Sequence, residues 1–193
     1  HGLGLVLGII AFPFLVIKSF DYSGFWKPTS LIIYGLSIII LYAASTFYHA
    51  AKEPKLRRKL NIFDHSAIYV LIAGTYTPFT LIVLEGSTGW IIFILTWIFA
   101  LIGIVLKLFF TGRFDKLSTI MYVFMGWQVV FAIKPLMNNL SSDGLFWLFI
   151  GGISYTIGAV LYTIRKLPYN HAVFHVFVLF GSISHFISVY FFL

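Results

Sequence analysis

The chain has 193 residues, of which 60% are hydrophobic and only 10% are charged. Soluble domains have about 25% charged residues, and a small globule leaves much of its surface in water, so this composition excludes a soluble fold. The net charge of +7 comes from residues between apolar runs, which indicates membrane topology and contact with anionic lipid rather than nucleic-acid binding. The absence of cysteine excludes disulfides and thiolate metal sites, so any zinc must use His, Asp or Glu.

The apolar runs are continuous and long enough for helices that cross a bilayer, which need about 20 residues. Barrel strands would alternate in shorter segments. The sequence therefore predicts an all-α polytopic membrane protein, with seven transmembrane helices in a single domain over residues 1–193. In chain order, the predicted spans are His1–Lys18, Thr29–Ala51, Asn61–Leu84, Thr88–Thr111, Leu117–Met137, Gly144–Ile164 and Asn170–Phe192.

Two features qualify these spans. The first begins at His1, already inside an apolar run and without a charged leader, which favours a helix trimmed at its N-terminus over a signal peptide. Pro13 and Pro78 lie within spans, where proline is expected to kink a helix.

The loops between the spans differ in charge. The second, fourth and sixth loops hold ten Lys and Arg residues, whereas the first, third and fifth hold three. The ten are Lys52, Lys55, Arg57, Arg58, Lys59, Lys107, Arg113, Lys116, Arg165 and Lys166. The positive-inside rule places these loops in the cytoplasm, so we expect an N-terminus inside and a C-terminus outside. A common seven-helix receptor has the opposite orientation.

Ionisable residues within spans are costly and usually face a functional site. Five of the six candidates share one depth, at predicted cytoplasmic helix ends. His49 ends the second span, Asp64 and His65 begin the third, and His171 and His175 begin the seventh. This coincidence of depth is the strongest indication of function in the sequence.

His171 and His175 are four residues apart, which places two imidazoles on one helical face in a spacing that suits one metal ion. His49 from another helix would complete a three-histidine site, and a catalytic zinc typically keeps three protein ligands and one open position. Asp64 could then bind the water at that position or act as its base. Ser45 lies four residues before His49, so it faces the same way and could support the site.

Structural alternatives exist for each of these residues. Interfacial histidines can lie among lipid headgroups without binding metal. His65 is about 100° around the helix from Asp64, so a packing or hydrogen-bonding role is favoured. His185 is the sixth candidate and lies about 15 Å beyond His175 along the helix, which favours a buried, hydrogen-bonded residue outside the coordination sphere. Glu85 is expected to be solvated in an outer turn.

Three segments together resemble the hemolysin III family, a bacterial branch of the progestin and adipoQ receptor group, which is similar to alkaline ceramidases. They are Ser45–His49, Asp64–Phe79 and His171–His175. The likeness covers nearly the whole chain, although the polar residues that the family has before the position of His1 are missing here.

The resemblance implies seven helices with an inside N-terminus and a zinc ion near the cytoplasmic face. By family analogy, His49, His171 and His175 would be the zinc ligands. Asp64 and Ser45 would be the candidate catalytic residues, with Asp64 contacting the zinc-bound water and Ser45 lying beside the site. It also suggests metal-dependent, ceramidase-like hydrolysis of a lipid amide or ester.

Three functions therefore compete for a multi-pass protein of the cell membrane, expected to be the bacterial plasma membrane. The first is a zinc-dependent hydrolase whose partner is a membrane lipid. The second is a hemolysin, a cytolytic or pore-forming protein, although polar residues at mostly one depth do not line a whole pore. The third is a lipid receptor or sensor with structural zinc. Sequence alone does not separate the first from the third.

Overall fold

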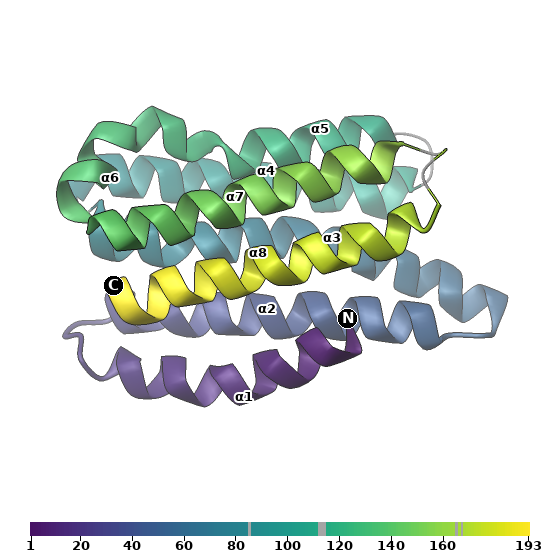
Figure 1. Cartoon of the computed structure of the whole chain (residues 1–193), viewed down its shortest axis with the longest axis horizontal. Coiled ribbons are helices and arrows are strands. Elements are labelled where there is room, and N and C mark those ends of the chain that lie inside the picture. The colour runs from purple at the N-terminus through teal and green to yellow at the C-terminus, as the bar shows by residue number, and fades with distance from the viewer. Residues whose placement is uncertain (85, 112–114, 165, 167) are drawn as a thin grey trace.

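The computed structural model describes residues 1–84, 86–111, 115–164, 166 and 168–193, and these contain helices but no strand. The helices are α1 Gly2–Ser19, α2 Trp26–Ala50, α3 Pro54–Pro78, α4 Gly86–Phe110, α5 Asp115–Gly126, α6 Ile133–Asn139, α7 Ser142–Thr163 and α8 Asn170–Phe192 (Figure 1). Within the described residues, seven helical segments are long and apolar enough to cross a membrane. The prediction of seven transmembrane helices is confirmed. Glu85, Arg113 and Arg165 lie outside the described residues.

The basic stretch after α2 differs from the predicted loop. Helix α3 begins at Pro54, seven residues before the predicted start, so most of Lys52–Lys59 is helical. Glu53 caps this helix, since its carboxylate accepts hydrogen bonds from the backbone N–H groups of Lys55 and Leu56 at 2.9 and 2.5 Å. An acidic N-cap followed by proline at the first helical position is a strong start for a helix. The exposed basic residues therefore lie on a helical extension of the third span.

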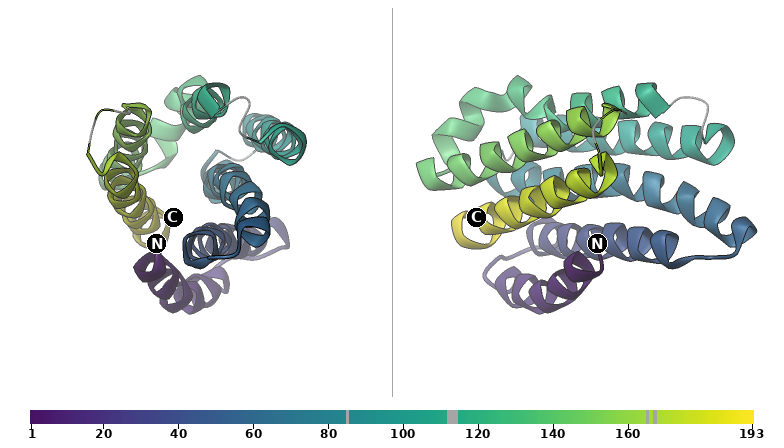
Figure 2. Two further views of the ribbon diagram at one scale, coloured as in Figure 1. Left: turned by 90° about the vertical axis from the view of Figure 1, so that its right-hand side faces the viewer. Right: turned by 45° about the vertical axis from the view of Figure 1, so that its right-hand side comes forward.

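The helices surround a common interior when viewed end-on (Figure 2, left). Helices α2 and α3 pack closely against each other, as do α7 and α8, while α4 packs on α3. Small residues allow the close pairs, because a Cβ at Gly74 of α3 would collide with Ser37 of α2. Similarly, a Cβ at Gly151 of α7 would collide with His185 of α8. Close approach through small residues is the usual basis of helix association in lipid.

Two spans lose regular α-helical geometry, one near its end and one in its interior. Helix α1 continues through Pro13, but α3 ends at Pro78 and continues as a π-helical turn over Phe79–Val83, since proline cannot donate the helical hydrogen bond. The fifth span, predicted as one helix, consists of α5, a 3-10 turn over Gln128–Ala132 and α6. Irregular backbone at membrane depth is tolerated where it lines a protein interior and other groups satisfy it.

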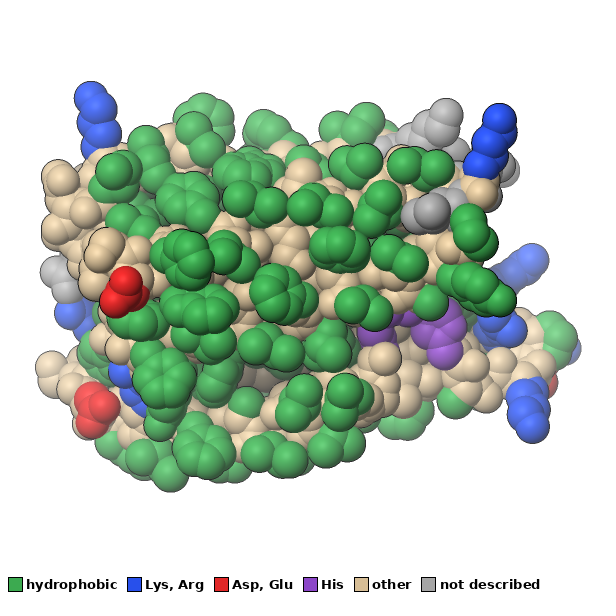
Figure 3. All heavy atoms as spheres, in the orientation of Figure 1, with side chains coloured by type: hydrophobic (Ala, Val, Ile, Leu, Met, Phe, Trp, Pro, Cys, Tyr) green, Lys and Arg blue, Asp and Glu red, His purple; other side chains and the backbone are tan. Residues whose placement is uncertain are grey.

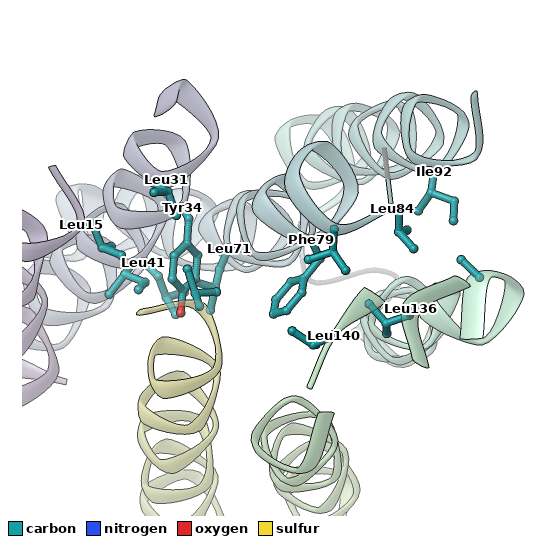
Figure 4. Close-up of a cluster of buried hydrophobic side chains, with 14 of the residues drawn as sticks. Leu15, Leu31, Tyr34, Leu41, Leu71, Phe79, Leu84, Ile92, Leu136 and Leu140 are labelled. Atoms are coloured by element: carbon teal, nitrogen blue, oxygen red, sulfur yellow. The ribbon is translucent and has the colours of Figure 1, made fainter. Parts of the chain in front are cut away.

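The apolar side chains divide between a buried cluster and the outer surface. The largest buried cluster includes Leu31, Tyr34, Leu71, Phe79 and Leu136, which converge from several helices (Figure 4). The outside is also apolar along the helices, and Lys and Arg side chains gather at the two ends (Figure 3). Exposed apolar surface of this extent is suited to lipid, as expected for a chain that crosses a membrane.

Candidate metal centre

Three histidines from two helices meet at one end of the bundle. His49 lies near the end of α2, and His171 and His175 lie in the first two turns of α8. The Nε2 atoms of His49 and His175 are 3.2 Å apart. One ligand nitrogen from each of the three rings lies within 4.8 Å of the others. The structure thus brings together the three imidazoles that the sequence singled out. On the surface, histidine side chains are visible toward the end of the molecule where several Lys and Arg side chains lie (Figure 3).

Hydrogen bonds between helices hold these rings at a common depth. The Tyr42 hydroxyl of α2 donates to the Ser182 hydroxyl of α8 at 2.8 Å, and the Tyr155 hydroxyl of α7 lies 2.7 Å from the same oxygen. Tyr42 is two turns before His49, and Ser182 is two turns after His175. The shared bond therefore fixes the relative height of α2 and α8 and, with it, the meeting of their histidines.

The three histidines form a group that could hold a metal ion, and one pair of them has the spacing that zinc requires. Zinc–nitrogen distances of 2.0–2.1 Å with tetrahedral angles place two ligand nitrogens ~3.3 Å apart, close to the 3.2 Å between His49 and His175. Imidazole is a preferred ligand of zinc, whereas calcium and magnesium prefer oxygen. The other ring nitrogen of His175, Nδ1, is buried and has no hydrogen-bond partner among the described residues. His49, His171 and His175 are therefore the residues that would hold the ion.

Asp64 supplies a buried carboxylate beside the histidines. It is 9% exposed and is near enough to His49 and His171 to interact with their charges. Its oxygens do not belong to the close group of ligand atoms formed by the three histidines. The Asp64 carboxylate therefore lies near the three histidines but outside the close group of their nitrogens, where it could act on a bound water or substrate.

Ser45 lies beside this carboxylate. The side chain is fully buried, and its hydroxyl makes no hydrogen bond of standard length and angle within the described structure. It is nevertheless close enough to the Asp64 carboxylate to interact with it. A buried hydroxyl next to a carboxylate can orient it by a hydrogen bond once either group shifts slightly.

The two remaining candidates are hydrogen-bonded to backbone carbonyls, as expected. The Nδ1–H of His65 donates to the Asn61 carbonyl at 2.8 Å, and His185, 8% exposed, donates from Nε2 to the Leu148 carbonyl at 3.0 Å. His65 nevertheless lines the same cavity as Asp64. The rotation of about 100° between adjacent helical residues therefore does not exclude His65 from the cavity.

His1 is a site neighbour that the sequence reasoning did not include. Its ring centroid lies 3.6 Å from that of His175 and 5.2 Å from that of Tyr42. Both of its ring nitrogens are buried without a hydrogen-bond partner in the described part of the chain. The depth argument would have found it, because His1 occupies the predicted cytoplasmic end of the first span.

A cavity of about 150 Å³ opens from the histidines into the bundle. Asp64, His171 and His175 line its polar end, and mostly apolar or aromatic side chains such as Leu41, Ile72 and Val178 line the rest. Ligand sites commonly combine apolar walls with a few convergent polar groups. The arrangement suits a long apolar ligand with a polar group at the histidines.

Comparison with known proteins shows to which family the chain belongs. The sequence profile of the Haemolysin-III related family matches residues 1–186, nearly the whole chain. The chain belongs to the hemolysin III family. Together with the seven apolar helices, this membership makes it a multi-pass membrane protein.

Individual members of the family and a more distant protein are similar to the chain. Hemolysin-3 homolog of Bacillus subtilis is 46% identical over 192 residues, covering the whole chain and 90% of that protein. Hemolysin-3 of Bacillus cereus is 45% identical over the same length, covering 88% of that protein. Human monocyte to macrophage differentiation factor is 28% identical over 175 residues, covering 86% of the chain and 71% of that protein. These matches confirm the resemblance drawn from the three sequence segments.

Proposed function

We propose that this protein is an intramembrane zinc hydrolase that cleaves an amide or ester bond of a membrane lipid. The observation that carries the proposal is the meeting of three imidazoles, two of which, His171 and His175, line the polar end of an apolar cavity together with the buried carboxylate of Asp64. A three-histidine ligand set leaves room for a reacting molecule at the ion, which is typical of catalytic rather than structural zinc sites.

The roles of the residues follow from their positions. Zinc held by His49, His171 and His175 would supply a Lewis acid that polarises the scissile carbonyl and activates water. Asp64 accepts the proton of the attacking water and passes it to the leaving amine or alcohol as the carbonyl–heteroatom bond breaks. Ser45 orients the Asp64 carboxylate. The apolar cavity holds the hydrocarbon part of the lipid and keeps bulk water away from the reacting groups.

The names of the relatives support a second candidate, a cytolytic activity, because two of them are called hemolysins. A pore would need a polar path through the bilayer, whereas the cavity of this chain is largely apolar beyond its histidine end. A receptor or sensor with structural zinc is the third candidate. The position of Asp64 outside the close group of ligand atoms favours the hydrolase over a closed structural site.

One experiment separates these functions. Purified, zinc-loaded protein is incubated with vesicles that contain amide- and ester-linked lipids and an entrapped dye, and both lipid cleavage and dye release are followed. We expect cleavage products without rapid dye release, and we expect chelation of zinc to stop cleavage. Dye release without cleavage would support the cytolytic candidate, and neither effect would favour a receptor or sensor.

A further inference from the structure

A second cavity lies beyond the first. It has a volume of about 50 Å³, and its walls include Phe79, Leu84, Ile92 and Leu136. Six residues line both cavities, which places the two spaces end to end. We call these six residues the waist: Thr75, Tyr76, Gly126, Trp127, Gly152 and His185.

Hydrogen bonds hold the large side chains of the waist in place. The Tyr76 hydroxyl donates to the Gly126 carbonyl at 2.9 Å and accepts from the Val129 N–H at 2.8 Å, so it satisfies backbone groups where the fifth span leaves α-helical geometry. The Trp127 ring N–H donates to the Thr156 hydroxyl at 2.9 Å. His185 is tied to the Leu148 carbonyl. These hydrogen bonds therefore fix the aromatic side chains of the waist in position.

The two glycines of the waist, Gly126 and Gly152, leave open space beside these side chains. A Cβ added at Gly126 or Gly152 would meet nothing within 4 Å, whereas one added at the neighbouring Gly151 would collide with His185. Gly151 is thus explained by packing of α7 on α8, and Gly126 and Gly152 are not. Both line the two cavities, so the open space beside them adjoins both cavities.

The first cavity extends about as far as the hydrocarbon part of one bilayer leaflet. His175 at its polar end and His185 at the waist are ten residues apart on α8, which corresponds to about 15 Å along the helix. One leaflet of a bilayer provides about half of a hydrocarbon core of roughly 30 Å. A short acyl chain with its head at the histidines would therefore end before the waist, and a longer chain would have to pass through it.

We propose that the waist selects the acyl-chain length of the bound lipid. The occupant is a single unbranched acyl chain whose polar head lies at the histidines and whose far end enters the second cavity between the waist aromatics. Gly126 and Gly152 leave the opening that this chain needs. The inference rests on the proposed function and adds to it the part of the lipid, the acyl chain, whose length decides binding.

Binding of radiolabelled octanoate and stearate to purified protein tests the proposal without requiring hydrolysis. In Gly152→Leu, stearate should bind at least about tenfold more weakly than in the wild type, because even two methylenes excluded from an apolar wall correspond to that factor. Octanoate should bind as in the wild type, because its chain ends before the waist. Gly126→Leu, on α5, should repeat the pattern.

Ile153→Phe is the matched control, since Ile153 neighbours Gly152 on α7 but is 47% exposed on the outer face. It should leave both ligands bound as in the wild type. Equal binding of stearate by the wild type and both waist variants would overturn the proposal, and so would an equal loss of octanoate and stearate. The proposed function can fail while this inference holds. If the protein cleaves no lipid but Gly152→Leu loses stearate binding alone, the waist still selects acyl-chain length.

Discussion

The two ends of the histidine-bearing face of α8 differ in what their imidazoles contact. His171 and His175 face another ring, with centroids of His49 5.0 and 5.1 Å away. His185, on the same helix, donates to the backbone carbonyl of Leu148 in α7. The residue type is the same, and the neighbouring helix decides its role. A histidine opposite other imidazoles is a candidate ligand, whereas a histidine bonded to a backbone carbonyl of its neighbour becomes part of the packing.

The polar surroundings differ in the same way. Asp64 and Ser45 are buried beside the first group, while the ring of His185 packs against Tyr155 at a centroid distance of 5.3 Å. A charge is tolerated inside a bundle when other polar groups accompany it. Substitutions should therefore separate the two regions, with effects on metal and chemistry at one and on stability at the other.

The largest effect should come from removing both ligands on α8. We expect purified wild-type protein to carry about one zinc ion per chain and His171→Ala/His175→Ala to carry almost none, because His49 alone cannot hold the ion. Elemental analysis by mass spectrometry measures the ratio. His65→Ala is the control, since it removes a nearby imidazole that is bonded to Asn61, and it should retain zinc. A double variant with the zinc content of the wild type would refute the site.

Asp64→Asn should have the next largest effect. The amide has the size of the carboxylate but cannot accept a proton, so lipid hydrolysis should fall by about 10²–10⁴-fold while zinc content stays unchanged. Hydrolysis and zinc are measured on the same preparation. Loss of zinc together with activity would make Asp64 a direct ligand, and full activity with full zinc would exclude it from the mechanism.

His185→Ala should affect stability instead. It removes a buried hydrogen bond, with a cost of about 1–3 kcal/mol, which corresponds to a fall of roughly 2–12 °C in Tm. Thermal unfolding of the detergent-solubilised protein measures this change, and zinc content should match that of the wild type. If His185→Ala loses zinc as the ligand variant does, the distinction between the two ends of α8 is wrong.

The smallest effect on the protein itself should come from Lys55→Cys, at the exposed start of α3. The chain has no other cysteine, so a membrane-impermeant thiol reagent reports this position alone. We expect no labelling in intact cells and strong labelling in inverted vesicles, because the positive-inside rule places the basic extension and the histidine end in the cytoplasm. Strong labelling in intact cells would reverse the predicted orientation of both termini.

Much of the fold could be predicted because a lipid bilayer permits few backbone structures. Continuous apolar runs of bilayer length must form helices that satisfy their own backbone, and the predicted and observed spans agree apart from their ends and the break inside the fifth span. The early start of α3 at Pro54 depends on the cap formed by Glu53, a local feature that hydropathy does not detect. The break of the fifth span depends on Tyr76, a residue of another helix that satisfies its backbone.

The sequence by itself determined the number of spans and the common depth of the histidines, because helical rise and apolar length are properties of each segment alone. It did not determine which rings face one another, because rotation and pairing of helices depend on side-chain contacts between segments far apart in the chain. Only the tertiary structure placed His1 against His175 and His65 on the cavity wall. It alone also joined four helical segments at the waist, since a cavity is made by the walls of several helices and has no counterpart in the pattern of any one of them.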